Sequence, residues 1–336
     1  MADAESEVHI EWYRVKLDKD TLRGLTQRSD LRGAFQALGF LVLLAITAAA
    51  VFYAWRNFPV WALILTLFVH GTLYAFLLNA FHELVHGTVF RSKWLNALFL
   101  RVYSFLSWNS HVSFRASHTR HHLYTLHPPS DGEVVLPIHL SASQFGAAAL
   151  IDPLGLFMTV KGTVWNALGG RNSTWEDRIF PVKDRRGRRR LMGWAWVLLV
   201  GHAVIVTVSL LSGFWIIAVL TTGARFYGGW LQWLCNSTQH VGLRDRVPDF
   251  RLCCRTIRLN PVIRFLYFHM NFHTEHHMYA SVPCYNLGRL RRIILSELPP
   301  ARGLSGAWQE IVEILRIQKR DSAYQHTNAL PPLRGS

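Results

Sequence analysis

The sequence predicts an all-α integral membrane protein with four transmembrane helices in two hairpins, additional interfacial helices and a metal-binding cap on the cytoplasmic side. Half of the 336 residues are hydrophobic and only 17% are charged. The apolar residues form long runs without charge, which soluble domains rarely contain. Histidines recur in three closely spaced groups beside these runs. The apolar runs thus predict the spanning helices, and the histidine groups predict the cap.

The chain is strongly basic, with a net charge of +15 and a pI near 10.2. In a soluble protein such a charge would suggest a nucleic-acid partner. Here the basic residues lie between and after the hydrophobic runs, as the positive-inside rule expects, and no groove-binding motif accompanies them. We therefore expect no nucleic-acid partner. We expect instead a cationic cytoplasmic surface that attracts anionic lipid head groups, an acidic acyl carrier or an acidic electron donor.

The hydropathy pattern divides the chain into a cytoplasmic N-terminal segment (1–33), a membrane and metal-binding domain (34–290), and a cytoplasmic C-terminal helix and tail (291–336). The N-terminal segment is polar and carries both signs of charge, so no cleavable signal peptide is expected. The cysteines lack Cys-x-x-Cys spacing, which predicts reduced, buried thiols at Cys235, Cys253, Cys254 and Cys284.

The first predicted hairpin joins two uncharged apolar runs, from Ala34 to Trp55 and from Val60 to Ala80. Each run is long enough to span a bilayer, and the short connection between them returns the chain to the side that it left. The second run contains His70. We expect this histidine to be packed or hydrogen-bonded rather than to bind metal.

The stretch between the hairpins is expected to lie at the membrane surface. The apolar segment from Trp94 to Trp108 is short and flanked by basic residues, which favours an interfacial helix. Pro128 to Gly132 marks a loop. A proline and a lysine interrupt Ser141 to Leu168, which favours helices lying on the membrane, with deep re-entry as the alternative. Lys183 to Arg190 holds six basic residues, which predicts a cytoplasmic position.

The second predicted hairpin runs from Leu191 to Leu211 and, after a turn, from Phe214 to Leu234. It contains the charged residue Arg225, for which a structural role by snorkelling or carboxylate pairing and a functional role both remain open. The rest of the chain is polar and basic. Within it, Gly288 to Ile317 has the pattern of an amphipathic helix with a break at Pro299-Pro300.

Three histidine groups have the spacing of metal ligands. Because residues i, i+3 and i+4 lie on one face of a helix, each group presents two or three imidazoles to one point. The composition predicts on the order of 0.04 His-x-x-His-His matches per chain, whereas the sequence contains two. Chance is therefore a poor explanation. The candidate ligands are His82 and His86, then His118, His121 and His122, then His273, His276 and His277.

Both hairpins return to the cytoplasm in this topology, so the three groups and His240 are expected to meet on one face of the membrane. Eight histidines in the groups exceed the ligands of one tetrahedral zinc and imply two metal ions. Neutral imidazoles suit zinc, copper, nickel or iron. The economical hypothesis is a cytoplasmic di-iron cap that activates dioxygen against an unactivated C–H bond.

The three groups, in this order around two hydrophobic hairpins, resemble the histidine boxes of the membrane fatty acid desaturase and hydroxylase superfamily. The resemblance covers roughly Ala34 to Leu290, and it implies an O2-dependent oxidoreductase with two iron ions. Acyl-CoA desaturases of this family have a further Asn-x-x-x-His after the fourth span, which Asn236 and His240 match. The resemblance therefore implies a metal site made of His82, His86, His118, His121, His122, His240, His273, His276 and His277, with Asn236 acting through water.

In two respects the sequence differs from particular subgroups of this superfamily. The first box has three intervening residues, as in many acyl-lipid and bacterial members, so it does not favour the acyl-CoA subgroup. The His-Pro-Gly-Gly signature of a fused cytochrome b5 domain is absent from the sequence. We therefore expect an external electron donor, which could be a ferredoxin, a rubredoxin or a cytochrome. The expected location is a bacterial inner membrane, with the termini and the active site in the cytoplasm.

Three functions are weighed. The first is desaturation of a fatty acyl chain or related lipid; the second is hydroxylation of a lipid, an alkane or a small apolar substrate by the same ligands. The third is metal transport, which the sequence disfavours because transporters place their ligands near the bilayer midplane. Here the boxes lie at or beyond the ends of the predicted spans.

Several residues near the boxes keep two interpretations. Glu83 and Glu275 could orient a ligand imidazole, or they could face solvent beside an arginine. His269 lies one helical turn before His273 and could join the last box. No spacing selects His111, His127, His139 or His202.

Overall fold

The structure is a computed structural model that describes residues 9–332, and most of these residues are helical. The first eight residues of the predicted N-terminal segment and the last four of the predicted tail lie outside the described part. Its only strands are two residues long, β1 (Ile257–Arg258) and β2 (Arg302–Gly303), and they pair in parallel. The predicted all-helical class is confirmed for the described residues.

The first hairpin is longer than predicted. The short helix α1 (Lys19–Leu25) precedes α2 (Asp30–Asn57), whose first turn is capped by the Ser29 side chain. After a turn, α3 (Val60–Tyr74) leads through a bend into α4 (Leu77–Val85). The stretches Lys19–Asn57 and Val60–Val85 are each long and apolar enough to cross a membrane. The first histidine box therefore lies at the end of this hairpin, on α4 and directly after it.

The second hairpin differs from the prediction. Its first helix, α10 (Arg185–Leu211), is a third stretch that is long and apolar enough to span. The expected return helix from Phe214 to Leu234 is instead divided into short elements. They are α11 (Ile216–Leu220), the 3-10 turn η1 (Ala224–Phe226) and α12 (Trp230–Asn236). An unbroken fourth span is therefore not found in the described residues.

Side chains from other elements compensate for this break. His70 Nε2 lies 3.0 Å from the Leu220 carbonyl oxygen, and the Tyr74 hydroxyl donates to the Thr221 carbonyl at 2.9 Å. The Trp108 indole donates to the Thr222 carbonyl at 2.9 Å. Broken helices are tolerated at membrane depth when neighbouring groups satisfy the freed carbonyls. The predicted hydrogen-bonded role of His70 is confirmed.

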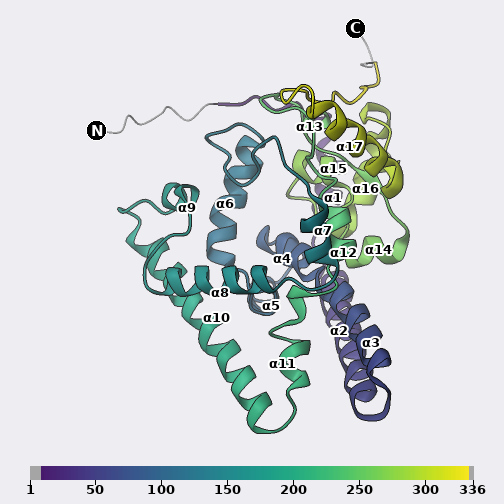
Figure 1. The fold of residues 1–336 in the computed structure, drawn as a ribbon. Coiled ribbons are helices and arrows are strands. Elements are labelled where there is room, and N and C mark those ends of the chain that lie inside the picture. The colour runs from purple at the N-terminus through teal and green to yellow at the C-terminus, as the bar shows by residue number, and fades with distance from the viewer. Residues whose placement is uncertain (1–8, 333–336) are drawn as a thin grey trace.

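Helices that connect the hairpins lie across their upper ends (Figure 1). They are α5 (Lys93–Leu106), α7 (Ala142–Ala149), α8 (Pro153–Ala167) and α9 (Thr174–Ile179). In Figure 1, α8 runs across the molecule between the cap and the hairpin that contains α10. Leu154 and Phe157 on α8 are 68% and 61% exposed, as expected for a helix that lies on a membrane surface.

The cap lies above both hairpins, and the two ends of the described chain are on that side (Figure 1). The predicted C-terminal amphipathic pattern forms two helices separated by the proline pair. The elements of the cap are α6 (His111–Tyr124), α13 (Phe250–Cys253), α14 (Pro261–Leu266), α15 (His273–Met278), α16 (Cys284–Ile294), the 3-10 turn η2 (Leu295–Glu297) and α17 (Leu304–Gln318). All four cysteines are free and buried, as predicted.

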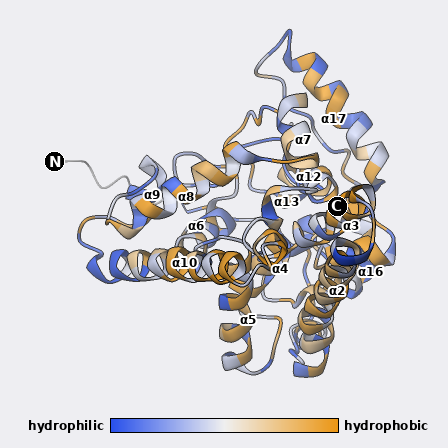
Figure 2. Ribbon diagram, turned by 60° about the horizontal axis from the view of Figure 1, so that its bottom comes forward, coloured by the Kyte–Doolittle hydropathy of each residue, from blue (hydrophilic) through white to orange (hydrophobic). Residues whose placement is uncertain are grey.

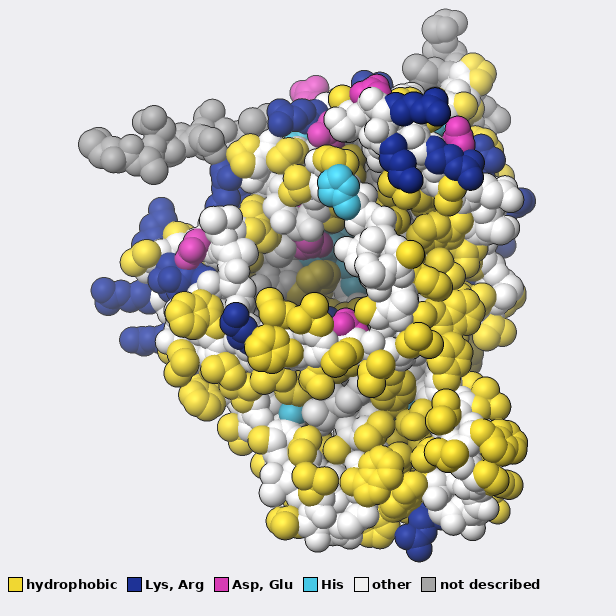
Figure 3. All heavy atoms as spheres, viewed as in Figure 1, with side chains coloured by type: hydrophobic (Ala, Val, Ile, Leu, Met, Phe, Trp, Pro, Cys, Tyr) yellow, Lys and Arg dark blue, Asp and Glu magenta, His cyan; other side chains and the backbone are white. Residues whose placement is uncertain are grey.

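The surface is divided by polarity. Figure 2 shows α2 as mostly hydrophobic, whereas the N-terminal turns of α10 are hydrophilic. In Figure 3, hydrophobic side chains cover the lower part of the molecule and most Lys and Arg side chains lie on the cap or beside α9. Ile46, Trp61 and Leu211 are exposed by 58%, 65% and 84%. Apolar exposure on this scale suits a lipid-facing surface.

Candidate metal centre

Each histidine box lies on or at the end of a helix. His82 belongs to α4 and His86 follows its last residue, while the second box occupies the last two turns of α6. The third box forms α15, all six residues of which are buried. Because the spacings place the rings of each box on one helix face, three helix segments are enough to gather eight imidazoles.

One group, the first cluster, combines all three boxes. Its ligand-capable side-chain atoms lie within 4.8 Å of one another. The imidazole rings of His82 and His118 are 4.1 Å apart between centroids, and those of His86 and His276 are 4.7 Å apart. The members of the first cluster are His82, His86, His118, His122 and His276.

A second group, the second cluster, contains His240, Cys254, His273 and His277, again with ligand-capable atoms within 4.8 Å. His240 follows α12 and thus comes from beyond the three boxes. His121 lies beside this cluster, with its ring centroid 5.2 Å from that of His240 and 4.9 Å from that of His277. The structure therefore brings all nine predicted histidines together in two adjacent groups.

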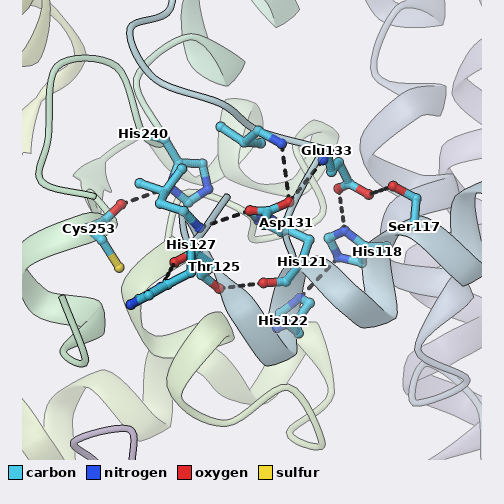
Figure 4. A network of polar contacts seen from close by, with 12 residues as sticks. Ser117, His118, His121, His122, Thr125, His127, Asp131, Glu133, His240 and Cys253 are labelled. Carbon is cyan, nitrogen blue, oxygen red and sulfur yellow. Dashed lines mark hydrogen bonds and ion pairs between the residues drawn. The ribbon is translucent and has the colours of Figure 1, made fainter. Parts of the chain in front are cut away.

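Hydrogen bonds to fixed acceptors orient several of these rings (Figure 4). His118 Nδ1 is 2.7 Å from Glu133 Oε1, and His121 Nδ1 is 2.8 Å from Asp131 Oδ2. His240 Nδ1 lies 2.8 Å from the Cys253 carbonyl oxygen. An acceptor at Nδ1 selects the tautomer in which Nε2 is free to bind a metal.

Three residues beside the clusters, Asp131, Glu133 and Cys254, were not predicted from the sequence as part of the site. The two acidic residues follow the second box closely, in a loop that the sequence marked only by its prolines and glycine. Asp131 is fully buried, and its carboxylate also accepts from the backbone N–H groups of Leu126 and Glu133. A carboxylate within a few residues of a histidine box could have suggested a partner for a ligand imidazole.

Several buried ring nitrogens have no hydrogen-bond partner among the described residues. They include His86 Nε2, His277 Nε2 and both ring nitrogens of His276. Elsewhere, ring nitrogens face each other: His118 Nε2 is 3.0 Å from His122 Nε2, and His240 Nε2 is 2.9 Å from His273 Nε2. Buried polar atoms without partners are costly, and metal ions bound through one nitrogen of each ring would satisfy most of them. The donor set therefore fits metal ions.

The protonation states also suit metal binding. Burial lowers the pKa of His240 to about 3 and the pKa of His86 to about 4. Burial likewise lowers the pKa of His273 and His277 well below the ordinary value. These rings are neutral at physiological pH, which is the form that binds metals. For His121, burial opposes protonation, but the Asp131 carboxylate prevails and raises the pKa.

The two glutamates inside the boxes differ from each other. Glu83 is 1% exposed and lies 3.2 Å from His276 Nδ1, so the solvent-facing interpretation is wrong and the carboxylate is placed to orient an imidazole. Glu275 is fully buried, pairs with Arg291 at 2.5 Å and accepts from the Thr256 hydroxyl. The predicted pairing with an arginine is therefore found, but the pair is buried in the protein and Glu275 does not face solvent.

Two other residues that were predicted near the site, Asn236 and His269, are not members of either cluster. Asn236 is exposed, and its side-chain oxygen accepts from Asn79 at 3.2 Å. Its predicted role as a ligand through water stays a prediction. His269 belongs to neither cluster, and its backbone has a φ of 57°. Among the histidines that no spacing selected, His202 stacks between Phe105 and Trp108.

A cleft of about 1010 Å³ opens beside the first cluster, between α6, α8, α9 and α10. Figure 3 shows the hollow above the hydrophobic part of the surface, with acidic and histidine side chains inside it. Phe114 and Glu133 line the cleft, and both contact His118, Phe114 by stacking with ring centroids 4.8 Å apart. Arg225 also lines it and donates to the Ser107 carbonyl at 2.5 Å.

The sequence was compared with known protein families and with curated proteins. A family model described as "fatty acid desaturase" matches residues 58–305. The match covers most of the chain, including all three boxes and His240. The comparison with curated proteins found no match.

Proposed function

The chain belongs to the membrane fatty acid desaturase and hydroxylase superfamily, and on that premise we propose that it is an O2-dependent di-iron desaturase of a fatty acyl chain or related lipid. The observation that carries this proposal is the pair of adjacent clusters of buried and half-buried imidazoles, most of them neutral. Family membership supports an oxidoreductase, and the clusters supply sites for two metal ions.

We assign the nine histidines to two irons. The first cluster provides one complete set, and His121 joins the histidines of the second cluster to provide the other. The orphaned ring nitrogens and the low pKa values support this assignment. The first iron is assigned to His82, His86, His118, His122 and His276, and the second to His121, His240, His273 and His277, with Asn236 predicted to act through water.

When bound, the iron pair would supply the oxidising power that removes hydrogen from an unactivated methylene. The reaction balances if the lipid gives up two hydrogens and a donor adds two electrons, with two protons, so that one O2 becomes two waters. The protein's own residues hold the imidazoles in place. Asp131 and Glu133 fix two of them, and Glu83 lies beside a third.

The cleft is proposed as the place where the lipid chain lies. One wall comes from the apolar face of α10, with Leu191, Ala195 and Leu198, and Phe114 separates the cleft from two ligand rings. The opposite side is polar and is held by the buried Glu176, which accepts from the Asn166 amide at 3.1 Å. An apolar wall continuous with a spanning helix favours a substrate that enters from the bilayer.

The proposed orientation places the cap, the cap-side ends of both hairpins and both termini in the cytoplasm. The proposed location is a bacterial inner membrane. The basic start of α10 and the basic cap support this orientation. Electrons are proposed to come from an external ferredoxin, rubredoxin or cytochrome.

Lipid analysis of a host that expresses the chain tests the proposed function. We expect new lipids that lack two hydrogens, and we expect His276→Asn to abolish them. His269→Asn is the matched control, because His269 lies four residues before the third box and belongs to neither cluster. Asparagine also tolerates its positive φ. Lipids that gain one oxygen would instead indicate hydroxylation, and an unchanged lipid profile with an iron-loaded protein would contradict both reactions.

A further inference from the structure

The first described residues of the chain are fixed across the cap near the second cluster. The Tyr13 backbone N–H donates to the Pro248 carbonyl at 2.8 Å, and the Tyr13 hydroxyl donates to Glu297 at 2.5 Å. The Arg251 guanidinium lies 3.7 Å from the centre of the Tyr13 ring. These contacts hold the neighbouring residue, Trp12, in a defined place.

Trp12 begins a chain of packed rings that reaches the second cluster. Its half-buried indole stacks on Phe250, with centroids 4.1 Å apart and planes 7° apart, and donates to the Leu123 carbonyl at 2.9 Å. Phe250 is fully buried, and its ring is 5.6 Å from that of His277. One buried ring thus separates a surface indole from a proposed iron ligand.

The surface around Trp12 is mainly cationic. Arg14 and Lys16 are exposed on the same segment, which also carries exposed carboxylates at Glu11 and Asp18. The exposed Arg246 belongs to an adjacent loop, because its backbone N–H donates to the Leu126 carbonyl, three residues beyond the carbonyl that Trp12 contacts. We name Trp12, Arg14, Lys16 and Arg246 the Trp12 surface.

We propose that the Trp12 surface is where an acidic one-electron carrier protein docks and where electrons enter toward the second cluster through Phe250 and His277. The proposal rests on the proposed function, which requires two electrons from outside. At each encounter the carrier is oxidised by one electron and the iron centre is reduced by one. Two encounters supply the two electrons for each double bond.

Complementary charge is the expected recognition mode for such a transient partner, because it speeds the encounter without requiring a large interface. A second exposed aromatic pair on the cap offers a comparison. Trp308 is also half-buried and donates to a backbone carbonyl, but it stacks on Trp233, which continues to Phe145 rather than to a box histidine. Trp308 therefore serves as the matched control.

The test follows anaerobic reduction of the iron-loaded, full-length protein in lipid nanodiscs by stopped-flow absorption. A [2Fe–2S] ferredoxin, a rubredoxin and a soluble cytochrome b5 are compared, and the fastest with the wild type becomes the probe. Trp12→Leu should weaken carrier binding and slow reduction about tenfold or more, whereas Trp308→Leu should match the wild type. Arg14→Glu with Arg246→Glu should slow reduction by about tenfold and flatten its dependence on salt.

Phe250→Leu distinguishes the effect of the electron path from the effect of carrier docking. It should leave carrier binding unchanged and slow the electron transfer within the complex. Wild-type rates in Trp12→Leu, or equal slowing in Trp308→Leu, would overturn the proposal, as would a wild type that dithionite reduces but none of the three carriers does. Failure of the proposed function is distinguishable, because it appears as a protein that binds no iron, or as an iron-loaded protein that accepts electrons but leaves the host lipids unchanged.

Discussion

Asp131 links a histidine of the second box to the backbone of the following loop. Its carboxylate holds His121 at 2.8 Å, and it also accepts from the backbone of the loop that it belongs to. The loop therefore folds around the same carboxylate that orients the ligand. Because the pKa of Asp131 is lowered mainly by its bond to His121, against the effect of burial, the group stays ionised.

Replacing this carboxylate should weaken metal binding at the second cluster. Mutating the hydrogen-bond partner of a ligand imidazole typically lowers metal affinity 10- to 100-fold. A chelator competition should therefore show that Asp131→Asn binds iron with an affinity lower by about that factor. Asp152→Asn is the control, since Asp152 caps α8 through the Gly155 N–H and contacts no box histidine. Equal iron retention in the two variants would show that Asp131 does not position a ligand.

The buried histidines predict how the metal-free protein responds to acid. The unfolded chain binds protons at histidine near pH 6.5, whereas His240 stays neutral in the folded chain until about pH 3. The folded state therefore has its full stability above pH 6.5 and loses it as the pH falls below that value. We expect the thermal midpoint of the metal-free protein to drop between pH 7.5 and pH 5.5.

A variant isolates the contribution of one ring to this acid sensitivity. In His240→Asn, the free energy of unfolding should fall less steeply as the pH is lowered, by roughly 1 kcal/mol per pH unit compared with the wild type. A midpoint that does not change with pH, or an identical slope in the variant, would contradict neutral buried imidazoles.

At the residue scale, spacing predicted the eight box histidines that the structure gathers, and the family resemblance added His240. The i, i+3, i+4 rule works because it depends only on local helix geometry. The partners of those histidines were not predicted, because Asp131, Glu133 and Cys254 reach the clusters through loop conformation. The burial of Glu83 likewise depends on α4 packing against the other boxes.

At the scale of elements, the broken return segment of the second hairpin is the main departure from expectation. Its hydropathy is that of a spanning helix, so composition gave no reason to expect a break. Three side chains stabilise the break. His70 and Tyr74 belong to α3, and Trp108 is the second residue after α5. Such compensation comes from distant parts of the chain and cannot be predicted from a local window.

Close packing of α3 against this broken segment can be tested with two glycines. A Cβ at Gly71 would lie 2.4 Å from the Tyr227 carbonyl oxygen, whereas a Cβ at Gly193 in α10 meets nothing within 4 Å. Gly71→Ala should destabilise the protein by about 1–3 kcal/mol. Gly193→Ala should be neutral or slightly stabilising, because alanine favours helix. Equal thermal midpoints in detergent would contradict the packing of α3 on Tyr227.

At the scale of the molecule, the distribution of polarity suits a membrane protein, although three rather than four stretches of the described chain are long and apolar enough to span. The lower part of the molecule is mainly hydrophobic (Figure 3), apart from polar residues such as Arg56 and Asn57 at the end of α2. The first box lies on α4, at the other end of the first hairpin, and the second and third boxes lie on α6 and α15 of the cap. Hydropathy and the basic clusters were enough to predict this arrangement. The cleft was not predicted, because it arises from how α6, α8, α9 and α10, which are separate in sequence, pack around a common space.

Cysteine labelling tests the proposed orientation. The four native cysteines are buried, so background labelling by a membrane-impermeant maleimide should be low. We expect Asn57→Cys and Ser212→Cys, at the tips of the two hairpins, to react from outside intact cells. Arg186→Cys, in the first turn of α10, should react only after lysis. Labelling of Arg186→Cys in intact cells would mean that the cap lies on the other side.

Mössbauer spectroscopy of the purified protein loaded with ⁵⁷Fe tests the central claim most directly. If nine histidines hold an iron pair, the spectrum should show two irons per chain in histidine-rich surroundings. His276→Asn should lower the iron content, and His269→Asn should not. A protein that retains less than one iron per chain after careful loading, or that retains zinc in its place, would contradict the account.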